Sequence, residues 1–482
     1  MISCMNDLQE CGFRIRGLVT DNHAANVAAF KILLNTYPGD NQTYFQMPKA
    51  VNNTYVFFDT VHLVKNLRNN LLNAKKFVFP KFKFEVCDVV LEADEGFLSW
   101  QDLHKIYDKD SNLNGNLRKA PKLTYRALHP GNNKQNVSLA LGIFHETTIA
   151  ACKSYFPLRR DMSEFLKLIS TWWTIANSNT RYNANSLGNA IENDDGKLNF
   201  YEELAQWVEE WCQCPHFSLS KQTANAFVLT LRSQAKLIQD LLSEGYEYVL
   251  TRRLQSDPIE HRFSRYRSLS GGRFLVSLRE VNTSERILTC RSLLKAGVNY
   301  WEEKEDHVYS DTEAITNFMQ KLEEHEGELF EINLCDDSVE VAQFVAGYAA
   351  KKLLKNPCND CSVHLIEINC KNEENYLNLL SRGSLITPSK NLASMVACLF
   401  AQAEYINSIM GSSNVRKLSQ VALEKYAPEE EISCTAHRKL NRSKIIKIVI
   451  NCFYNNMQKL STDRVRTEAI ADFKKRQRKK DQ

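Results

Sequence analysis

The apolar positions near the start of the chain form two short runs, and each run is followed by an aspartate and then by a helical pattern. Residues 5–12 have the pattern of a helix end, and residues 13–20 (FRIRGLVT) predict a strand that ends at Asp21. A turn and a helix are predicted directly after Asp21. Residues 54–72 (TYVFFDTVHLVKNLRNNLL) repeat the same order around Asp59. This repeated order of strand, acid and helix indicates an α/β unit.

An acid at the carboxyl end of a strand points into the crevice where α/β sheets hold ligands. Asp21 is equally well explained as a helix N-cap, and the same alternative holds for Asp59. The helix after Asp59 places His62, Lys65 and Asn69 on one face. Such a face is usually only solvated, but beside two acids it also suits a surface that handles phosphate.

The pattern changes between residues 80 and 250, where aromatic and leucine residues recur at helical spacing. This predicts a mainly helical module of about 170 residues, whose Trp and Phe side chains are most simply core. Because the module separates the strand-rich start from a later acidic helix, we expect it to be an insertion. The expected fold is therefore an α/β core interrupted by a helical insertion and followed by a helical C-terminal region.

The acidic helix lies in residues 253–274 (RLQSDPIEHRFSRYRSLSGGRF), around which the rest of the chain is organised. Asp257 is expected to cap this helix, with Pro258 at its first position and Glu260 reaching back as in a capping box. A double glycine at 271–272 predicts its end. A plain helix start explains these residues, but several arginines crowd around the acids: Arg262, Arg265, Arg267 and Arg273. A carboxylate here could hold a metal ion while arginines grip phosphate.

Beyond the acidic helix the chain becomes acidic from residue 302 to 340, which predicts solvated helix and linker. The expected division is a core at 1–80, an insertion at 81–250, the return of the core at 251–300, a linker at 301–338 and a C-terminal region at 339–482. The last ten residues, FKKRQRKKDQ, form a basic tail that suits solubility, nuclear import or nucleic acid.

Composition narrows the class of protein. The net charge of +4 is too small to indicate nucleic-acid binding, so any DNA contact must come from local patches. Fourteen irregularly spaced cysteines and no secretory signal favour a reducing compartment. No apolar run reaches about 18 residues, so no membrane span is expected. Cys358 and Cys361 could form half of a zinc site with His364 and Cys370, but their spacing favours free or packed thiols.

Several motifs occur in an order that points to one family: GLVTDNHAAN (17–26), FFDTVHLVKNLRNNL (57–71), APKLTYRALHP (120–130), SDPIEHRFSRYR (256–267), and GYAAKKL (347–353) with C-x-x-C and then SRGSLITPS (381–389). Each is weak alone. Together they resemble the P element-type transposases, whose animal relatives often carry an N-terminal THAP zinc domain. The resemblance implies an RNase H-like core split by a GTP-binding insertion.

The resemblance also implies cut-and-paste DNA transposition by two-metal chemistry with Mg²⁺. Asp21 would be the acid that ends the fourth strand of the core, and Glu260 the acid on the late helix. Asp59 would be a metal helper or a cap. Contacts to DNA would come from basic residues around the acids: Lys65, Arg68, Arg262, Arg265 and Arg267. The family further implies a homo-oligomer in the nucleus that binds transposon ends and target DNA.

For the insertion, the resemblance implies GTP as a cofactor that is not hydrolysed. Lys122 would meet the phosphates, the loop near Val137 would contact the nucleotide, and Asn177 and Asp257 would lie near the guanine. Thr174 stands where the family has an aspartate, and a hydroxyl cannot accept two hydrogen bonds from guanine as a carboxylate does. The chain has no P-loop motif, which argues against an ordinary GTPase.

One acid of the expected site has no counterpart. An RNase H-like site also needs an aspartate on its first strand, yet only 20 residues precede Asp21. The interval from Asp21 to Asp59 (59 − 21 = 38 residues) holds one helix and one strand, too little for the missing elements. We therefore expect a truncated or decayed transposase that is inactive alone. The alternatives are a domesticated, non-catalytic DNA- or protein-binding nuclear factor and a helical scaffold without a nucleic-acid role.

Overall fold

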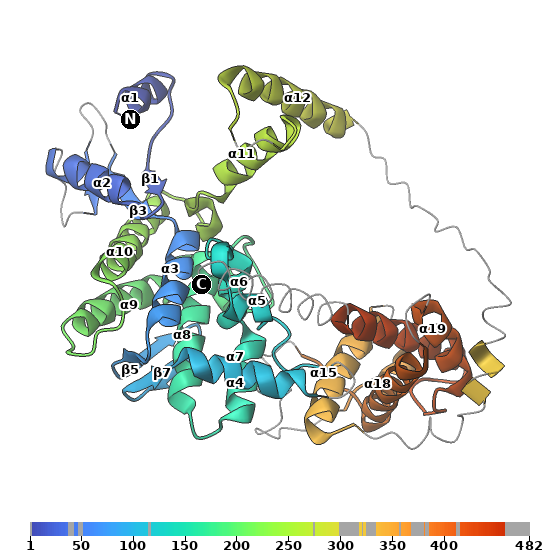
Figure 1. Ribbon diagram of the computed structural model, residues 1–482. Coiled ribbons are helices and arrows are strands. Elements are labelled where there is room, and N and C mark those ends of the chain that lie inside the picture. The colour runs from blue at the N-terminus through green and yellow to red at the C-terminus, as the bar shows by residue number, and fades with distance from the viewer. Residues whose placement is uncertain are drawn as a thin grey trace, which may run out of the picture.

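The computed structural model is mostly helical, and its described residues form two large hydrophobic cores and one small cluster (Figure 1). The first core is formed by residues 5–249 and the second mainly by residues 318–454. The structure describes residues 2–36, 43–46, 52–113, 117–272, 275–297, 318–320, 322–323, 334–355, 358–367, 380, 385–410 and 415–457. The expected acidic linker lies mostly outside these residues, and the basic tail lies entirely outside them.

A three-stranded sheet organises the N-terminal part. Strands β1 (Gly17–Thr20) and β3 (Thr54–Phe58) are parallel, and β2 (Tyr44–Phe45) is antiparallel to β3 on its other side. Thr20 is in register with Phe58, so β1 and β3 end at the same edge of the sheet. Helices follow both strands directly: α2 (Ala24–Thr36) and α3 (Thr60–Asn73), while α1 (Ile2–Glu10) precedes β1. Both predicted units of strand, acid and helix are confirmed, although β1 is shorter than predicted.

The long helix α10 (Lys221–Ser243) packs against this sheet. Thr230 Oγ1 accepts a hydrogen bond from the Phe58 N–H at 3.0 Å, and the Tyr55 hydroxyl donates to Asp240 at 2.6 Å. Burial raises the pKa of Tyr55, so its hydroxyl keeps this proton. The predicted boundaries at residues 80 and 250 therefore do not divide the first core, because the last helix of the expected insertion covers the sheet.

Two small antiparallel pairs precede the helices of the expected insertion. Strand β4 (Phe77–Phe79) pairs with β7 (Gly96–Leu98), and β5 (Phe82–Val86) pairs with β6 (Val89–Ala93). The sequence reading missed them although β5 alternates buried and exposed side chains, the period of a strand. The helical prediction holds for the rest: α4 (Trp100–Ser111), α5 (Tyr125–Leu128), α6 (Val137–Ile143), α7 (Glu146–Tyr155), α8 (Arg160–Ala176) and α9 (Lys197–Cys212).

The predicted acidic helix is α11 (Asp257–Leu269), which follows the short helix η5 (Thr251–Leu254) and packs against α12 (Leu278–Gly297). Figure 1 shows α11 and α12 extending away from the helical body. Tyr266 is the buried residue of α11, whose other side chains are half-buried or exposed. Gly271 and Gly272 both have φ of +76°, which ends the helix as predicted.

The second core is built by helices, as predicted for the C-terminal region. They are α15 (Asp336–Leu353), α16 (Asn359–Leu365), α18 (Lys390–Met410), α19 (Val415–Tyr426) and a helix over residues 438–457. By length and composition alone, the stretch Lys390–Ile409 in α18 could cross a membrane. Leu392, Val396 and Leu399 of α18 are fully buried in this core, which explains its apolar character without a membrane.

Candidate active site

Asp21 lies at the end of β1 and shapes the turn into α2. Its Oδ1 accepts hydrogen bonds from Asn26 Nδ2 at 2.6 Å and from the His23 N–H at 3.2 Å. The contact to the amide two residues later closes an Asx turn. Since α2 begins only at Ala24, Asp21 holds the loop before the helix and remains half-buried at the edge of the sheet.

Asp59 caps α3, so the structural alternative for this residue is confirmed. Its Oδ1 accepts from the Val61 N–H at 2.9 Å, as a helix N-cap does. Its Oδ2 accepts a short hydrogen bond from the hydroxyl of Ser256, a residue 197 positions away. Asp59 is fully buried, and this burial raises the pKa of its carboxyl. The cap is thereby tied to the start of α11.

Glu260 reaches the same place from α11. Its Oε1 lies 3.4 Å from His62 Nε2 and 3.3 Å from Ser256 Oγ. One ligand atom from each of Asp59, His62 and Glu260 lies within 4.8 Å of the others. The Glu260 side chain remains 52% exposed, so the cluster opens to solvent.

The start of α11 differs by one residue from the prediction. Ser256 rather than Asp257 is the N-cap, and Asp257 is already helical. The Glu260 carboxylate accepts a hydrogen bond from the Ser256 hydroxyl, and the expected capping box does not form. With Ser256 at the N-cap, the third helical position is Ile259 and not Glu260, while the Ser256 hydroxyl donates to Asp59.

Lys65 of α3 is buried, and several acids influence the charge of its ammonium group. The side chain lies one turn after His62 on α3, and the residue is 6% exposed. Burial lowers the pKa of Lys65, while four carboxylates act to raise it: Glu260, Asp59, Asp21 and Asp257. Asp21 and Glu260 both contribute to the electrostatic environment of Lys65. Their catalytic role stays a prediction.

Lys65 and Arg68 of α3, which were expected to contact DNA, face inward in this structure, and their contact with DNA stays a prediction. Arg68 is fully buried and donates to the Lys134 carbonyl at 2.8 Å and to Asn69 Oδ1 at 2.9 Å. Burial lowers the pKa of Arg68. A buried guanidinium cannot touch DNA in this conformation, and the same holds for Lys65.

The arginines of α11 are closer to solvent. Arg262 forms a two-pronged pair with Glu285 of α12, with Nε 2.7 Å from Oε1, and this pairing raises the pKa of Arg262. Arg265 is exposed and Arg267 is half-buried. Of the predicted DNA contacts on α11, Arg265 is therefore exposed to solvent, whereas Arg262 is already paired with Glu285.

The residues expected to bind nucleotide form two pairs. Lys122 is exposed in the turn before α5, and its carbonyl lies against Gly142 of α6, where a Cβ atom would come within 2.5 Å. Val137 starts α6 and is half-buried. In the other pair, Asn177 Oδ1 accepts from Gln255 Nε2 at 3.3 Å, and Asp257 follows two residues later.

Helix α3 runs between these two pairs. Gln255 also donates to Thr60 Oγ1 at 3.0 Å, and Arg68 meets the segment before α6. These two positions on α3 are about 12 Å apart, from eight residues at 1.5 Å each. Two buried polar atoms beside this stretch, Arg68 Nη1 and Gln255 Oε1, have no hydrogen-bond partner among the described residues. Thr174 cannot replace the family aspartate, since its hydroxyl donates to the Ser170 carbonyl at 2.7 Å within α8.

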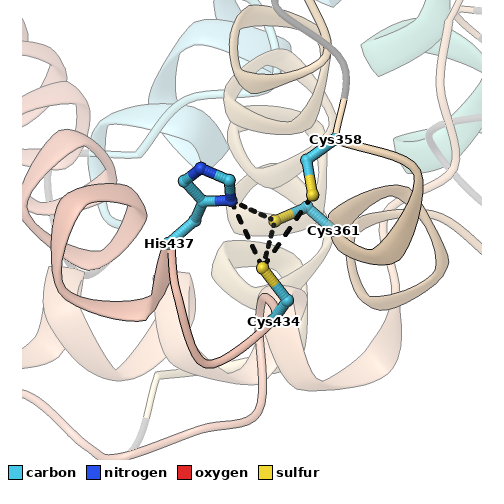
Figure 2. A group of neighbouring side chains, drawn as sticks. All are labelled: Cys358, Cys361, Cys434 and His437. Atoms are coloured by element: carbon cyan, nitrogen blue, oxygen red, sulfur yellow. Dashed lines mark hydrogen bonds between the residues drawn. The ribbon is translucent and has the colours of Figure 1, made fainter.

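Cys358 and Cys361 lie beside Cys434 and His437, not in the set that the sequence suggested (Figure 2). His364 is not a member of this group, and Cys370 lies outside the described residues. The C-x-x-H pair at 434–437 repeats the two-residue spacing of the C-x-x-C pair, and that signal could have been found in the sequence.

Comparisons with known proteins agree with the motifs. No family model matches the chain. The transposable element P transposase of Drosophila melanogaster is 22% identical over 453 residues, which cover 86% of this chain and 55% of that protein. The chain therefore spans about half the length of this relative. A solved structure, the Drosophila P element transposase strand transfer complex, matches with a TM-score of 0.49 and 20% identity over 60% of this chain and 63% of that chain. The similarity to a transposase, first seen in short motifs, thus extends over most of the sequence.

Proposed function

We propose that this chain is derived from a DNA transposase and that Asp21, Asp59 and Glu260 form its divalent-cation site. The observation that carries this proposal is the cluster of Asp59, His62 and Glu260, whose ligand atoms lie within 4.8 Å of one another although α3 and α11 are distant in the chain. Sequence similarity to a transposase over most of the chain supports it independently. DNA as substrate, self-association and a nuclear location belong to the same proposal.

The donor atoms suit a hard divalent cation. Mg²⁺ prefers carboxylate oxygens and keeps several waters, whereas Mn²⁺ also accepts an imidazole such as that of His62. Each Asp59 oxygen accepts one hydrogen bond, which leaves a further lone pair on each. When bound as a pair, such cations activate water or a DNA 3′-hydroxyl and stabilise the leaving oxygen.

The protein's own groups prepare this site. Ser256 fixes the carboxylates of Asp59 and Glu260 relative to each other, because its Oγ contacts both. Lys65 neutralises part of their repulsion in the folded protein. With four carboxylates around one ammonium, the site keeps a negative potential that attracts cations. Half-exposed Glu260 marks the side from which a phosphodiester can approach.

We propose that the chain alone cleaves DNA poorly. In the described sheet β1 is an edge strand, and the acids that act most strongly on Lys65 follow β1 and β3 or lie on α11. A non-catalytic DNA- or protein-binding factor is the second candidate. It is favoured by Lys65 itself, whose ammonium offsets part of the negative charge of the acids without any metal ion.

We also propose that a guanine nucleotide binds along α3 without being hydrolysed. Lys122 and Val137 would lie at its phosphate end and Asn177 and Asp257 at its base end. The unpartnered Arg68 Nη1 lies beside this stretch of α3 and would donate to the ligand only in a conformation that exposes it. Because Thr174 replaces an acid, selectivity for guanine over adenine should be weak.

The direct test of the cation site is a Mn²⁺ titration followed by calorimetry and electron paramagnetic resonance. We expect binding by the wild-type chain and at least tenfold weaker binding by Glu260→Gln, since an anionic ligand becomes neutral. Glu92→Gln, an exposed acid on the β5–β6 hairpin, serves as the matched control and should bind as the wild type does. Equal affinity in the wild type and Glu260→Gln would exclude the site as drawn.

A further inference from the structure

A second cluster of metal-ligating side chains lies in the C-terminal core, far along the sequence from the acids. Cys358 and Cys361 approach from the start of α16, while Cys434 and His437 lie just before the helix over residues 438–457 (Figure 2). The four donor atoms lie within 4.8 Å of one another. We propose that these four residues bind one structural Zn²⁺ ion.

The distances between donors fit a tetrahedron around zinc. A Zn–S bond of about 2.3 Å gives sulfur–sulfur edges of about 3.8 Å in a tetrahedral site. Cys434 Sγ lies 3.9 Å from Cys358 Sγ and 3.4 Å from Cys361 Sγ. His437 Nδ1 lies 3.6 Å from Cys361 Sγ and 3.3 Å from Cys434 Sγ. Three thiolates and one imidazole leave no open coordination position, which is the arrangement of a structural rather than a catalytic zinc.

The local chain geometry delivers the donors in two pairs. Both pairs have two residues between the ligands, the C-x2-C and C-x2-H spacings that suit one tetrahedral ion. Cys358 is the N-cap of α16 and Cys361 lies in its first turn, while His437 directly precedes the last described helix. Cys361 and Cys434 are 73 positions apart, so the sequence spacing alone hides the site.

A polar hydrogen approaches one of the sulfurs, as in known thiolate–metal sites. Asn441 Nδ2 donates to Cys361 Sγ at 3.6 Å, and Asn441 is itself buried. Such donors stabilise thiolate charge and orient the ligands. Cys361 is 4% exposed, so its sulfur is shielded from competing ligands.

A disulfide explains the cluster less well. Two of three cysteines could pair, with a bond of about 2.05 Å, but the third thiol and the imidazole would be left without a role. The reducing compartment expected from the cysteine usage also disfavours it. Zinc instead gives every donor a function and ties α16, a helix of only seven residues, to the last described helix. Metal binding of this kind contributes directly to folding.

The test starts with the full chain purified without added metal. We expect elemental analysis to find one zinc per chain, and to find less than one tenth of it in Cys434→Ser and His437→Ala. His364→Ala, which changes a histidine of α16 outside the cluster, and Cys290→Ser, which removes an exposed thiol of α12, are the matched controls and should keep the zinc. Full zinc content in Cys434→Ser would overturn the proposal.

Cobalt substitution identifies the ligands and distinguishes this site from the acid cluster. Co²⁺ added to the zinc-stripped wild type should give thiolate charge-transfer bands and the intense ligand-field bands of tetrahedral coordination. These bands should persist in Glu260→Gln and disappear in Cys434→Ser. If the cysteine variants do not fold, the wild type decides alone: the bands should vanish on adding equimolar Zn²⁺. A wild type that gives no such bands, or an intact-mass measurement that shows a disulfide in place of bound metal, would overturn the proposal.

Discussion

Replacing Asp59 with asparagine separates its cap role from its role as an anion. Asparagine caps helices as well as aspartate does, so the contact to the Val61 N–H should survive and α3 should lose little stability. Alanine at the same position should cost about 1 kcal/mol for the cap. It would also remove the hydrogen bond that Ser256 donates to Asp59, at about 0.5–1.5 kcal/mol more, because Glu260 remains as an acceptor for this hydroxyl.

The charge effect has a defined sign. Burial raises the pKa of Asp59, so the folded protein holds this proton more tightly than the unfolded chain does. Ionisation of Asp59 therefore costs stability above its folded-state pKa, and this cost vanishes below the unfolded value of about 3.9. In metal-free buffer at neutral pH, Asp59→Asn should be more stable than the wild type, and the difference should disappear as the pH falls through that window.

Divalent cations should stabilise the wild type more than Asp59→Asn. At a free cation concentration of 100 times its Kd, binding stabilises the wild type by about 2.7 kcal/mol. Loss of the anionic ligand should weaken binding at least tenfold, which is about 1.4 kcal/mol. In Mn²⁺ the wild type should therefore gain stability over Asp59→Asn.

Tryptophan fluorescence in a urea titration measures the free energy of unfolding of the first core without interference from the second core. The tryptophans of the first core, such as Trp172 and Trp211, are buried, and the sequence contains no tryptophan after residue 301. A metal-free Asp59→Asn that is less stable than the wild type at neutral pH would refute the reasoning. It would mean that the ionised carboxyl is held favourably by Lys65 and His62 rather than penalised by burial.

Three further predictions concern the same region. Lys65→Gln should tighten Mn²⁺ binding about fivefold or more in calorimetry. Removing a nearby positive charge is worth on the order of 1 kcal/mol even at high effective dielectric. Unchanged affinity would place Lys65 outside the site. Lys122→Ala should weaken GTP binding in calorimetric titration, with Arg126→Ala as its control from the same turn, and equal affinities would remove Lys122 from the nucleotide site. The purified chain with Mg²⁺ should cleave little DNA in a gel assay, and robust cleavage that Glu260→Gln abolishes would contradict this.

The sequence predicted the elements that carry their own local signal. The two strand–acid–helix units follow from an apolar run that stops at Asp21 or Asp59. The double glycine ended α11 for a backbone reason that needs no partner, because both residues have positive φ. The resemblance to a family then supplied what periodicity could not, namely that Glu260 returns to the sheet.

What the sequence could not predict depends on partners that are distant in the chain. Ser256 caps α11 and bridges two acids only because Asp59 lies opposite it in the fold. The β5–β6 hairpin was predicted as part of a helical module. The spacing of Phe82 and Phe84 fits both a strand and a helix when the segment is so short. Cys434 and His437 were not predicted as ligands because they lie far from Cys361 in the sequence.

Buried lysines show most clearly why local patterns fall short. Lys65 and Lys119 both look like solvated positions in the sequence, yet they are 6% and 1% exposed. Lys119 lies between the two cores, where it donates to Ser154 Oγ at 2.8 Å and pairs with Asp337 and with Glu340, the latter at 2.6 Å, on α15. A buried ammonium is stable only when acids surround it, so each of these lysines requires that distant segments be docked. The cation site and the contact between the two cores therefore share one feature. In each, a buried lysine lies near acids from distant segments of the chain. Replacing either lysine should therefore weaken the contact between two segments of the chain rather than affect only the protein surface.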